Sequence, residues 1–205
     1  MDYIFIDSKD GIEKVGIVEE GQLVEFYSDK EDDRKQAGNI YRGKVINVLP
    51  GMEAAFVDIG RGKNAYLYVK DAIPKELMYK NIKIKIDDII KGGEDIIVQV
   101  LKESSGNKGP KVTTHITLPG RFLVLIPFSN KINISRKIDD REEIKRLKEI
   151  GKEIQREDIG FIFRTKSLGV EKELLLDEYN MLVKIYKKIE REKNFLPCPK
   201  LIYKE

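Results

Sequence analysis

The sequence predicts an α+β fold, in which a small antiparallel β-barrel follows a few N-terminal strands and precedes a mixed helix and strand region. Three observations lead to this prediction. Apolar and polar residues alternate with period two between residues 39 and 71, with Pro- and Gly-containing turns at 50–51 and 60–64. Residues 1–35 hold short apolar runs separated by turn residues. After residue 139 the apolar residues recur with helical spacing.

The N-terminal strands are expected at Tyr3–Ile6, Glu13–Val18 and Leu23–Tyr27. Three strands alone make a thin sheet with no obvious layer to cover its apolar face. We therefore expect them to belong to something larger or to pack on the later part of the chain.

The barrel strands follow. Alternation is clearest in Lys44–Leu49 and Ala54–Ile59, and Ile96–Val100 reads as a closing strand. The segment Lys83–Ile90 fits either a strand or a short helix. A second pair of strands is expected around Pro119-Gly120, at Val112–Leu118 and Arg121–Pro127.

Two amphipathic helices are expected in the last third of the chain. In Asp140–Ile154 the acids come early and the bases late, which matches the helix dipole. Glu171–Asn194 is the longest predicted helix, and the two prolines at 197 and 199 stop it. Between the helices, Gly160–Thr165 reads as a strand that ends in a polar pair.

The composition limits the class of protein. Of the 205 residues, 36% are charged but the net charge is only +3, so any case for nucleic-acid binding must rest on local charge. The single cysteine, Cys198, cannot form an internal disulfide and fits a reducing compartment. The N-terminus lacks the features of a signal peptide, and the longest apolar run, Phe122–Phe128, is too short to span a bilayer. We expect a soluble, cytoplasmic protein with no membrane partner.

Basic residues are concentrated in two windows that contain no acid. The window 104–138 has six basic residues and 34–52 has four, whereas simple proportion would place about six acids in the longer one. Such windows can build a locally positive surface, although strand composition alone also disfavours acids. The aromatic residues Phe56 and Tyr66 sit beside the basic residues Arg42, Lys44, Arg61 and Lys63, a mixture that suits stacked bases and held phosphates. Lys108 and Lys111, which lie in the acid-free loop 104–111, are further expected RNA contacts.

Residue patterns for catalysis are missing. His115 is the one histidine, so a histidine-based triad or a Cys/His zinc site is not expected. We predict no catalytic residue and no metal ligand in this chain. The alternative is an enzyme in which Asp58 or Asp71 holds a metal ion.

Several ordered segments resemble a known family. They are NIYRGKV (39–45), EAAFVDIG (53–60), GNKGPKVTT (106–114), GRFLVLIP (120–127), ISRKI (134–138) and FRT (163–165). In this order they resemble the N-terminal half of the ribonuclease E/G family of bacterial endoribonucleases, and the resemblance runs along essentially the whole chain.

The resemblance implies a layout with three parts. Residues 1–35 would be the first strands of a split RNase H-like subdomain. Residues 36–115 would be an S1 domain, which is an RNA-binding OB-fold barrel inserted after those strands. Residues 116–205 would be an α/β region that senses a 5′-monophosphate on RNA. The family's catalytic carboxylates, which hold magnesium, and its zinc-linking cysteines would come after position 205, so magnesium and zinc are expected only for the full-length family enzyme.

The resemblance also implies site residues. Phe56, Tyr66 and Lys108 match positions where the S1 domain of the family touches RNA. The residues that match the 5′-phosphate pocket are Gly120, Val124, Arg164 and Thr165, and ISRKI adds Arg136. An arginine can hold a terminal phosphate with a two-pronged fork, and a threonine hydroxyl adds a donor.

Together these observations predict the RNA-binding and 5′-end-sensing part of a ribonuclease E/G-type endoribonuclease that acts in RNA processing and decay. The expected ligand is single-stranded RNA, preferably with a 5′-monophosphate, and a catalytic domain is the expected partner. The family enzyme is a magnesium-dependent hydrolase, and this chain alone is expected to show little or no cleavage. The alternative is a stand-alone S1-type RNA-binding protein without nuclease activity, such as an RNA chaperone or a ribosome-associated module.

Overall fold

A computed structural model of the chain describes residues 2–9, 12–30, 36–74, 77, 84–156, 159–192, 194 and 197–205. The chain divides into two compact units, residues 1–36 and 37–205. The predicted α+β class is confirmed, because both units contain sheets and the second also contains helices. Within the described residues no helix is long and apolar enough to cross a membrane.

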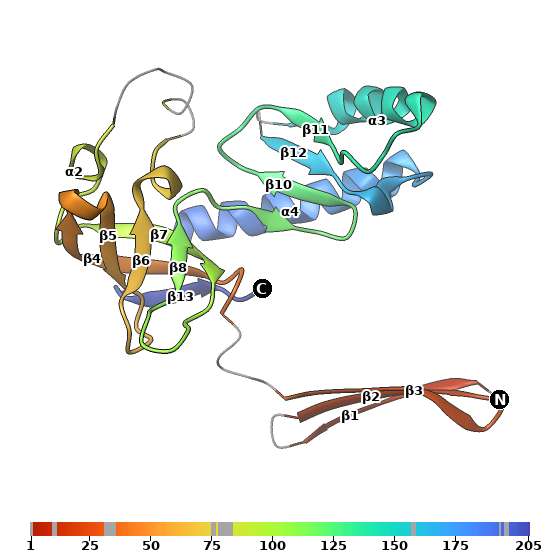
Figure 1. Ribbon diagram of the computed structural model, residues 1–205. Coiled ribbons are helices and arrows are strands. Elements are labelled where there is room, and N and C mark those ends of the chain that lie inside the picture. The colour runs from red at the N-terminus through yellow and green to blue at the C-terminus, as the bar shows by residue number, and fades with distance from the viewer. Residues whose placement is uncertain are drawn as a thin grey trace. The chain divides into compact units, whose positions relative to one another are not determined.

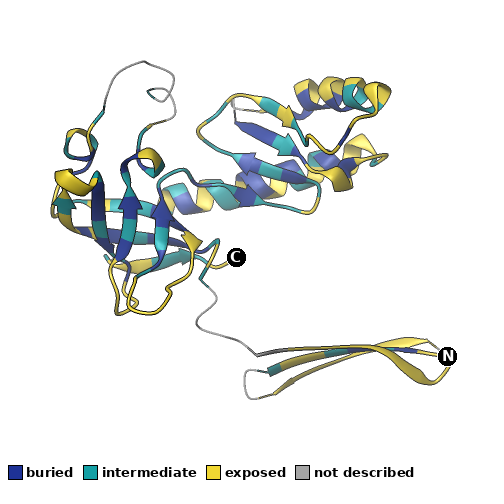
Figure 2. Cartoon of the chain, viewed as in Figure 1, coloured by how far each residue is buried: buried dark blue, intermediate teal, exposed yellow. Residues whose placement is uncertain are grey.

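The first unit is a three-stranded antiparallel sheet in the order β1-β2-β3 (Figure 1), formed by β1 (Tyr3–Lys9), β2 (Ile12–Glu19) and β3 (Gln22–Lys30). Its central rung aligns Phe5, Gly16 and Phe26. The Phe5 ring lies over Gly16, where an added Cβ would be 2.2 Å from that ring. Most of the sheet is exposed (Figure 2), including the large apolar side chains of Tyr3, Ile4, Phe5, Ile6, Leu23, Val24, Phe26 and Tyr27.

The second unit begins with a closed five-stranded barrel. Its strands are β4 (Ile40–Leu49), β5 (Ala54–Asp58), β6 (Ala65–Tyr68), β7 (Asp95–Lys102) and β8 (Lys111–Thr113). They pair in the order β4-β5-β6-β8-β7, and β4 closes the barrel against β7. All pairings are antiparallel except that of β6 with β8, which is parallel. This is the strand order of an OB-fold, as the sequence predicts.

Alternate side chains of the barrel strands fill its interior. Ala55, Val57, Leu67, Val98 and Val112 are fully buried there, and small residues at some of these positions let the strands curve tightly around the core. Short helical elements cover the ends of strands, at η1 (Pro50–Met52), η2 (Val69–Asp71) and α2 (Ile86–Ile89). The ambiguous segment Lys83–Ile90 is therefore helical at its centre, while residue 83 lies outside the described residues.

A four-stranded sheet and two helices form the other part of this unit. The sheet has the order β11-β12-β10-β9, and its strands are β9 (Leu118–Pro119), β10 (Leu123–Ile126), β11 (Ile132–Ile134) and β12 (Gly160–Phe163). The helices α3 (Arg141–Ile154) and α4 (Lys172–Glu192) pack buried side chains against those of the strands, and the turn η3 (Thr165–Ser167) leads from β12 toward α4. The Asp140 carboxylate caps α3 by accepting from two backbone N–H groups.

Both helices lie on the same face of this sheet. Gly151 of α3 packs so closely on Phe163 that an added Cβ would lie 3.2 Å from the ring, and the rings of Tyr179 in α4 and Phe161 are 5.2 Å apart. Phe161 and Phe163 point to one side because side chains alternate along a strand. Ile162 and Val124 consequently point to the opposite side, and both are only partly buried.

One expectation needs correction, and one strand was not expected. Val112–Leu118 is not one strand, because Thr114 N–H bonds to the Asp71 carbonyl and turns the chain, leaving β8 in the barrel and β9 in the other sheet. The segment after the C-terminal prolines also forms a strand, β13 (Lys200–Tyr203), which pairs with β4. Asn39 fixes its end by accepting from Glu205 N–H.

Candidate nucleic-acid interface

One row of side chains crosses the outer surface of the barrel. The strand register places Asn47, Phe56, Tyr66, Lys111 and Lys102 opposite one another on successive strands. Irregularities in β4 and β7 each add one residue, which brings Asn47 and Lys102 into this row. We call these five residues the barrel row. Phe56 and Tyr66 are partly exposed, whereas their strand neighbours are buried in the core.

The predicted basic residue Lys108 lies in a loop beside this row. Ser105 and Lys108 exchange two backbone hydrogen bonds and so form a tight turn. The Lys63 ammonium donates to the Gly106 carbonyl and ties the turn to the loop that precedes β6. The loops that precede β6 and β8 are thus joined, and Lys108 is exposed on the second of them.

Two other predicted basic residues are ion-paired. The Asp95 carboxylate lies 2.8 Å from Arg42 and 3.3 Å from Lys44. Partial burial opposes ionisation of Asp95, but hydrogen bonds from Lys44, Cys198 and Arg42 outweigh it and lower its pKa. Antiparallel pairing of β4 with β7 sets Lys44 directly opposite Asp95, so the acid-free window around residue 42 does not form an unpaired positive patch.

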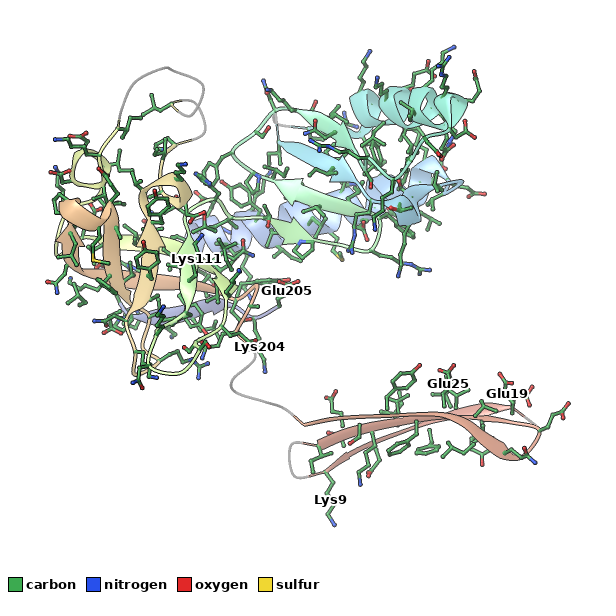
Figure 3. All side chains as sticks on the ribbon, in the orientation of Figure 1. Lys9, Glu19, Glu25, Lys111, Lys204 and Glu205 are labelled. Atoms are coloured by element: carbon green, nitrogen blue, oxygen red, sulfur yellow. The ribbon has the colours of Figure 1, made fainter. Side chains whose placement is uncertain are left out.

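Lys111 has a similar partner. Its ammonium lies 2.7 Å from the Asp71 carboxylate, and Figure 3 marks its position on β8. Asp71 precedes the buried turn at 72, and its backbone carbonyl also accepts from the Thr113 hydroxyl. The half-buried pair therefore holds Lys111 in place within the barrel row.

The residues of the predicted phosphate pocket meet at one edge of the four-stranded sheet. Strands β11 and β12 are parallel, so the residues that follow them, Ser135-Arg136 and Arg164-Thr165, emerge at the same end. Strand β10 is antiparallel to β12 and begins at this end, which places the segment 120–122 there too. We call residues 120–122, 135–136 and 164–165 the pocket edge.

Hydrogen bonds connect the three segments of the pocket edge. The Arg164 guanidinium donates to the Gly120 carbonyl, and Arg164 N–H donates to Phe122 O at 2.7 Å. The hydroxyls of Ser135 and Thr165 are 3.4 Å apart. Arg136 and Thr165 are exposed. The structure therefore brings Gly120, Arg164 and Thr165 together, and Arg136 directly follows Ser135, whose hydroxyl lies beside that of Thr165.

Val124 lies one rung inside this edge. It pairs with Ile162 and with Pro119, and this row forms a partly exposed apolar strip on the sheet face away from the helices. Arg164 continues β12 in extended conformation two residues after Ile162, so its side chain points to the same face. The edge thus combines a cationic end with an apolar floor.

The candidate metal and acid–base residues have other partners. The Asp58 carboxylate accepts from Gly60 N–H, and Nε2 of His115 lies 2.5 Å from the Ile73 carbonyl. Burial, with Asp95 beside it, raises the pKa of the Cys198 thiol to about 11. Among the residues that the structure describes, no three His, Cys, Asp or Glu side chains could share a metal ion.

Three residues of this interface are absent from the sequence prediction. Asn47 and Lys102 enter the barrel row only through irregular pairing, which alternation of apolar residues does not reveal. Glu178 approaches the pocket edge from α4, more than fifty positions away in the chain. Long-range contacts of this kind leave no local signal in the sequence.

The barrel defines a class of protein. An OB-fold whose outer surface carries partly exposed aromatic rings in one row with lysines is typical of modules that bind single-stranded nucleic acid. Comparison with known proteins gives the family. Residues 117–205 match the profile of the Ribonuclease E/G family.

Curated relatives match most of the chain. Ribonuclease G of Haemophilus influenzae is 38% identical over 198 residues, covering 94% of this chain and 40% of the relative. Ribonuclease G of Escherichia coli K12 is 38% identical, over 88% of this chain and 38% of the relative. Ribonuclease E of Nostoc sp. is 34% identical, over 92% of this chain and 28% of the relative. The chain belongs to the ribonuclease E/G family, and it spans 40% or less of the length of these relatives.

Proposed function

We propose that this chain is the RNA-binding and 5′-end-sensing N-terminal part of a ribonuclease E/G-type endoribonuclease that acts in RNA processing. The observation that carries the proposal is the barrel row, which aligns two aromatic rings with lysines across four neighbouring strands. Family membership supports RNA as the ligand. In this proposal the cytoplasm is the location, since a lone thiol suits a reducing compartment.

The barrel row would bind single-stranded RNA through bases and phosphates at once. Successive bases would stack on Phe56 and Tyr66, and each stacked base contributes about 1–3 kcal/mol. Lys111, Lys102 and the nearby Lys108 would hold backbone phosphates. None of these contacts distinguishes one base from another, so the surface would bind RNA with little sequence preference.

The pocket edge would recognise the 5′ end. A terminal monophosphate can accept two parallel hydrogen bonds from Arg164, a third from the Thr165 hydroxyl and charge stabilisation from Arg136. Val124 and Ile162 would support the first base from the apolar strip. A 5′-triphosphate would be excluded by size rather than by charge.

Cleavage is assigned to another part of the family enzyme. The described residues lack a fitting set of metal ligands, so no step of the proposal uses a metal held by this chain. Magnesium-binding carboxylates and zinc-binding cysteines would belong to the remaining length of the enzyme. This chain would orient the RNA and show little or no hydrolysis by itself.

Fluorescence anisotropy tests the proposal. One labelled oligoribonucleotide is prepared with a 5′-monophosphate, a 5′-triphosphate or a 5′-hydroxyl, and each is titrated with the full chain. We expect the monophosphate to bind most tightly and Arg164→Ala to remove that preference. Arg191→Ala is the matched control, because this exposed arginine lies in the last turn of α4, outside the pocket edge. Absence of binding to all three RNAs would reject the proposal.

A further inference from the structure

Glu178 of α4 holds three successive backbone amides, two within the pocket edge and the third in the residue that follows it. Its carboxylate accepts from Arg121 N–H at 2.7 Å, from Phe122 N–H at 2.8 Å and from Leu123 N–H at 2.7 Å. Successive amides aimed at one point form an anion-binding nest. Here the protein supplies the anion from its own helix.

Gly120 is shaped for this carboxylate. A Cβ added at Gly120 would lie 2.7 Å from Cδ of Glu178 and 2.9 Å from its Oε2. A larger residue would therefore push the carboxylate away from the amides. The absence of a side chain at 120 therefore serves the contact with Glu178.

The same short segment contacts Arg164 on its other side. The Gly120 carbonyl accepts from the Arg164 guanidinium, and the Phe122 carbonyl accepts from Arg164 N–H. Glu178 comes from the helix that covers one sheet face, whereas Arg164 points to the opposite face. Any movement of residues 120–123 away from Glu178 would therefore displace the guanidinium that they hold.

We infer that Glu178 is a positioning residue for 5′-phosphate recognition, an inference that rests on the proposed function. It fixes the loop 120–123 through the amide nest, and the loop in turn orients the Arg164 guanidinium. Because Glu178 fills the nest, a 5′-phosphate does not bind these amides. The phosphate instead approaches from the face that carries Arg164 and Thr165.

The inference makes Glu178 necessary for discrimination between RNA ends and not for RNA affinity in general. A glutamine at 178 keeps one acceptor oxygen, so it cannot accept from all three amides with the strength of a carboxylate. A loosened loop would leave the barrel row unchanged. The ratio of affinities for 5′-monophosphate and 5′-hydroxyl RNA is therefore the informative quantity.

The experiment measures this ratio by anisotropy in the full chain and in Glu178→Gln and Glu178→Asp, with melting temperatures recorded for each. Asp177→Asn is the matched control, since it removes a charge from the adjacent exposed position of α4. We expect Glu178→Gln to lower the ratio about tenfold, with unchanged affinity for 5′-hydroxyl RNA. Asp177→Asn should preserve the ratio.

Chemical rescue separates positioning from folding. In Glu178→Ala the nest is empty, and added formate can occupy it. Formate should raise the ratio in Glu178→Ala relative to chloride at equal ionic strength, and it should not raise the ratio in the wild type. A role in folding alone would change the melting temperature and leave the ratio as it is.

The outcomes separate this inference from the proposed function. Equal wild-type affinities for both RNA ends would overturn 5′-end sensing and the inference with it. A wild-type preference that persists undiminished in every folded Glu178 variant would overturn the inference alone. If Glu178→Gln fails to fold, the ratio in Glu178→Asp is used, since aspartate keeps both oxygens on a shorter side chain. A ratio as high as that of the wild type would then overturn the inference.

Discussion

Phe56 and Tyr66 face each other across strands β5 and β6, with ring centroids 6.0 Å apart and ring planes at 66°. This edge-to-face arrangement is a favourable geometry for two aromatic rings. Both rings lie outside the core that the neighbouring residues Ala55 and Leu67 fill. The pair is therefore available for contacts with a ligand while it stabilises the sheet.

Loss of the Phe56 ring should weaken RNA binding. Phe56→Leu is expected to reduce affinity for single-stranded RNA by about 1–3 kcal/mol, because leucine keeps an apolar side chain on the sheet but offers no ring for stacking. This corresponds to roughly 5- to 150-fold in the dissociation constant. Phe56→Tyr keeps the ring and should bind as the wild type does. Equal losses in both variants, measured by anisotropy, would argue against stacking.

Removing the partner of Lys111 should strengthen RNA binding. Asp71→Asn abolishes the 2.7 Å ion pair and removes a negative charge beside the barrel row. We expect tighter binding and a salt dependence whose slope is steeper by about one unit, since one more cation can contact phosphate. Titrations at several salt concentrations measure this slope. Weaker binding with magnesium-dependent cleavage lost in Asp71→Asn would instead support the alternative in which Asp71 holds a metal.

The loop that carries Lys108 depends on Gly109. A Cβ at this position would lie 1.9 Å from the Asn64 backbone carbonyl oxygen, which cannot move without shifting β6. Gly109→Ala should lower the free energy of unfolding by about 1–3 kcal/mol and weaken RNA binding. Gly92→Ala is the matched control, because nothing lies within 4 Å of its added Cβ. Urea denaturation compares the two, and similar stability of both variants would contradict the packing argument.

The ion pair of Glu143 and Arg146 should contribute stability that depends on pH. Hydrogen bonds from Arg146, opposed by burial and aided by Gly169 N–H, lower the pKa of Glu143. Stability from a lowered carboxylate pKa is present above the ordinary glutamate range and lost as the pH falls through the lowered value. Glu143→Gln should therefore cost about 1–2 kcal/mol near neutrality and progressively less on acidification.

Urea denaturation at a series of pH values checks this prediction. The exposed neighbour Glu142 provides the control variant Glu142→Gln, which removes the same charge without the contacts to Arg146 and Gly169. A gap between wild type and Glu143→Gln that widens toward low pH would refute the assignment.

Periodicity predicted the barrel and both long helices because these elements depend on local apolar patterns. The helix α3 begins at Arg141, one residue after the predicted start at Asp140, and α4 agrees with the predicted helix to within two residues at each end. The segment 112–118 was mispredicted because Thr114 turns the chain from one sheet into another, through a contact with distant Asp71. Strand β13 has only four residues and depends on its pairing with β4.

The residues of the candidate site could be predicted where residue type itself indicates a role. They could not be predicted where the role depends on contacts with residues distant in the sequence. The aromatic residues and the Arg164-Thr165 strand end were recognisable from sequence motifs. The ion pairing of the surface lysines was not recognisable, because Asp95 and Asp71 contact Lys44 and Lys111 only in the folded barrel. The role of Glu178 was also not predictable, because its hydrogen-bond donors are backbone N–H groups, which every sequence contains.

The central claim is that one surface binds the RNA strand and a second one reads its 5′ end. The most direct test crosses two variants, Phe56→Ala and Arg164→Ala, with two RNAs that differ only in a 5′-monophosphate or 5′-hydroxyl. We predict that Phe56→Ala weakens binding of both RNAs by the same factor, whereas Arg164→Ala weakens only the monophosphate RNA, by about tenfold. Equal wild-type affinity for the two RNAs, unchanged by Arg164→Ala, would contradict the claim.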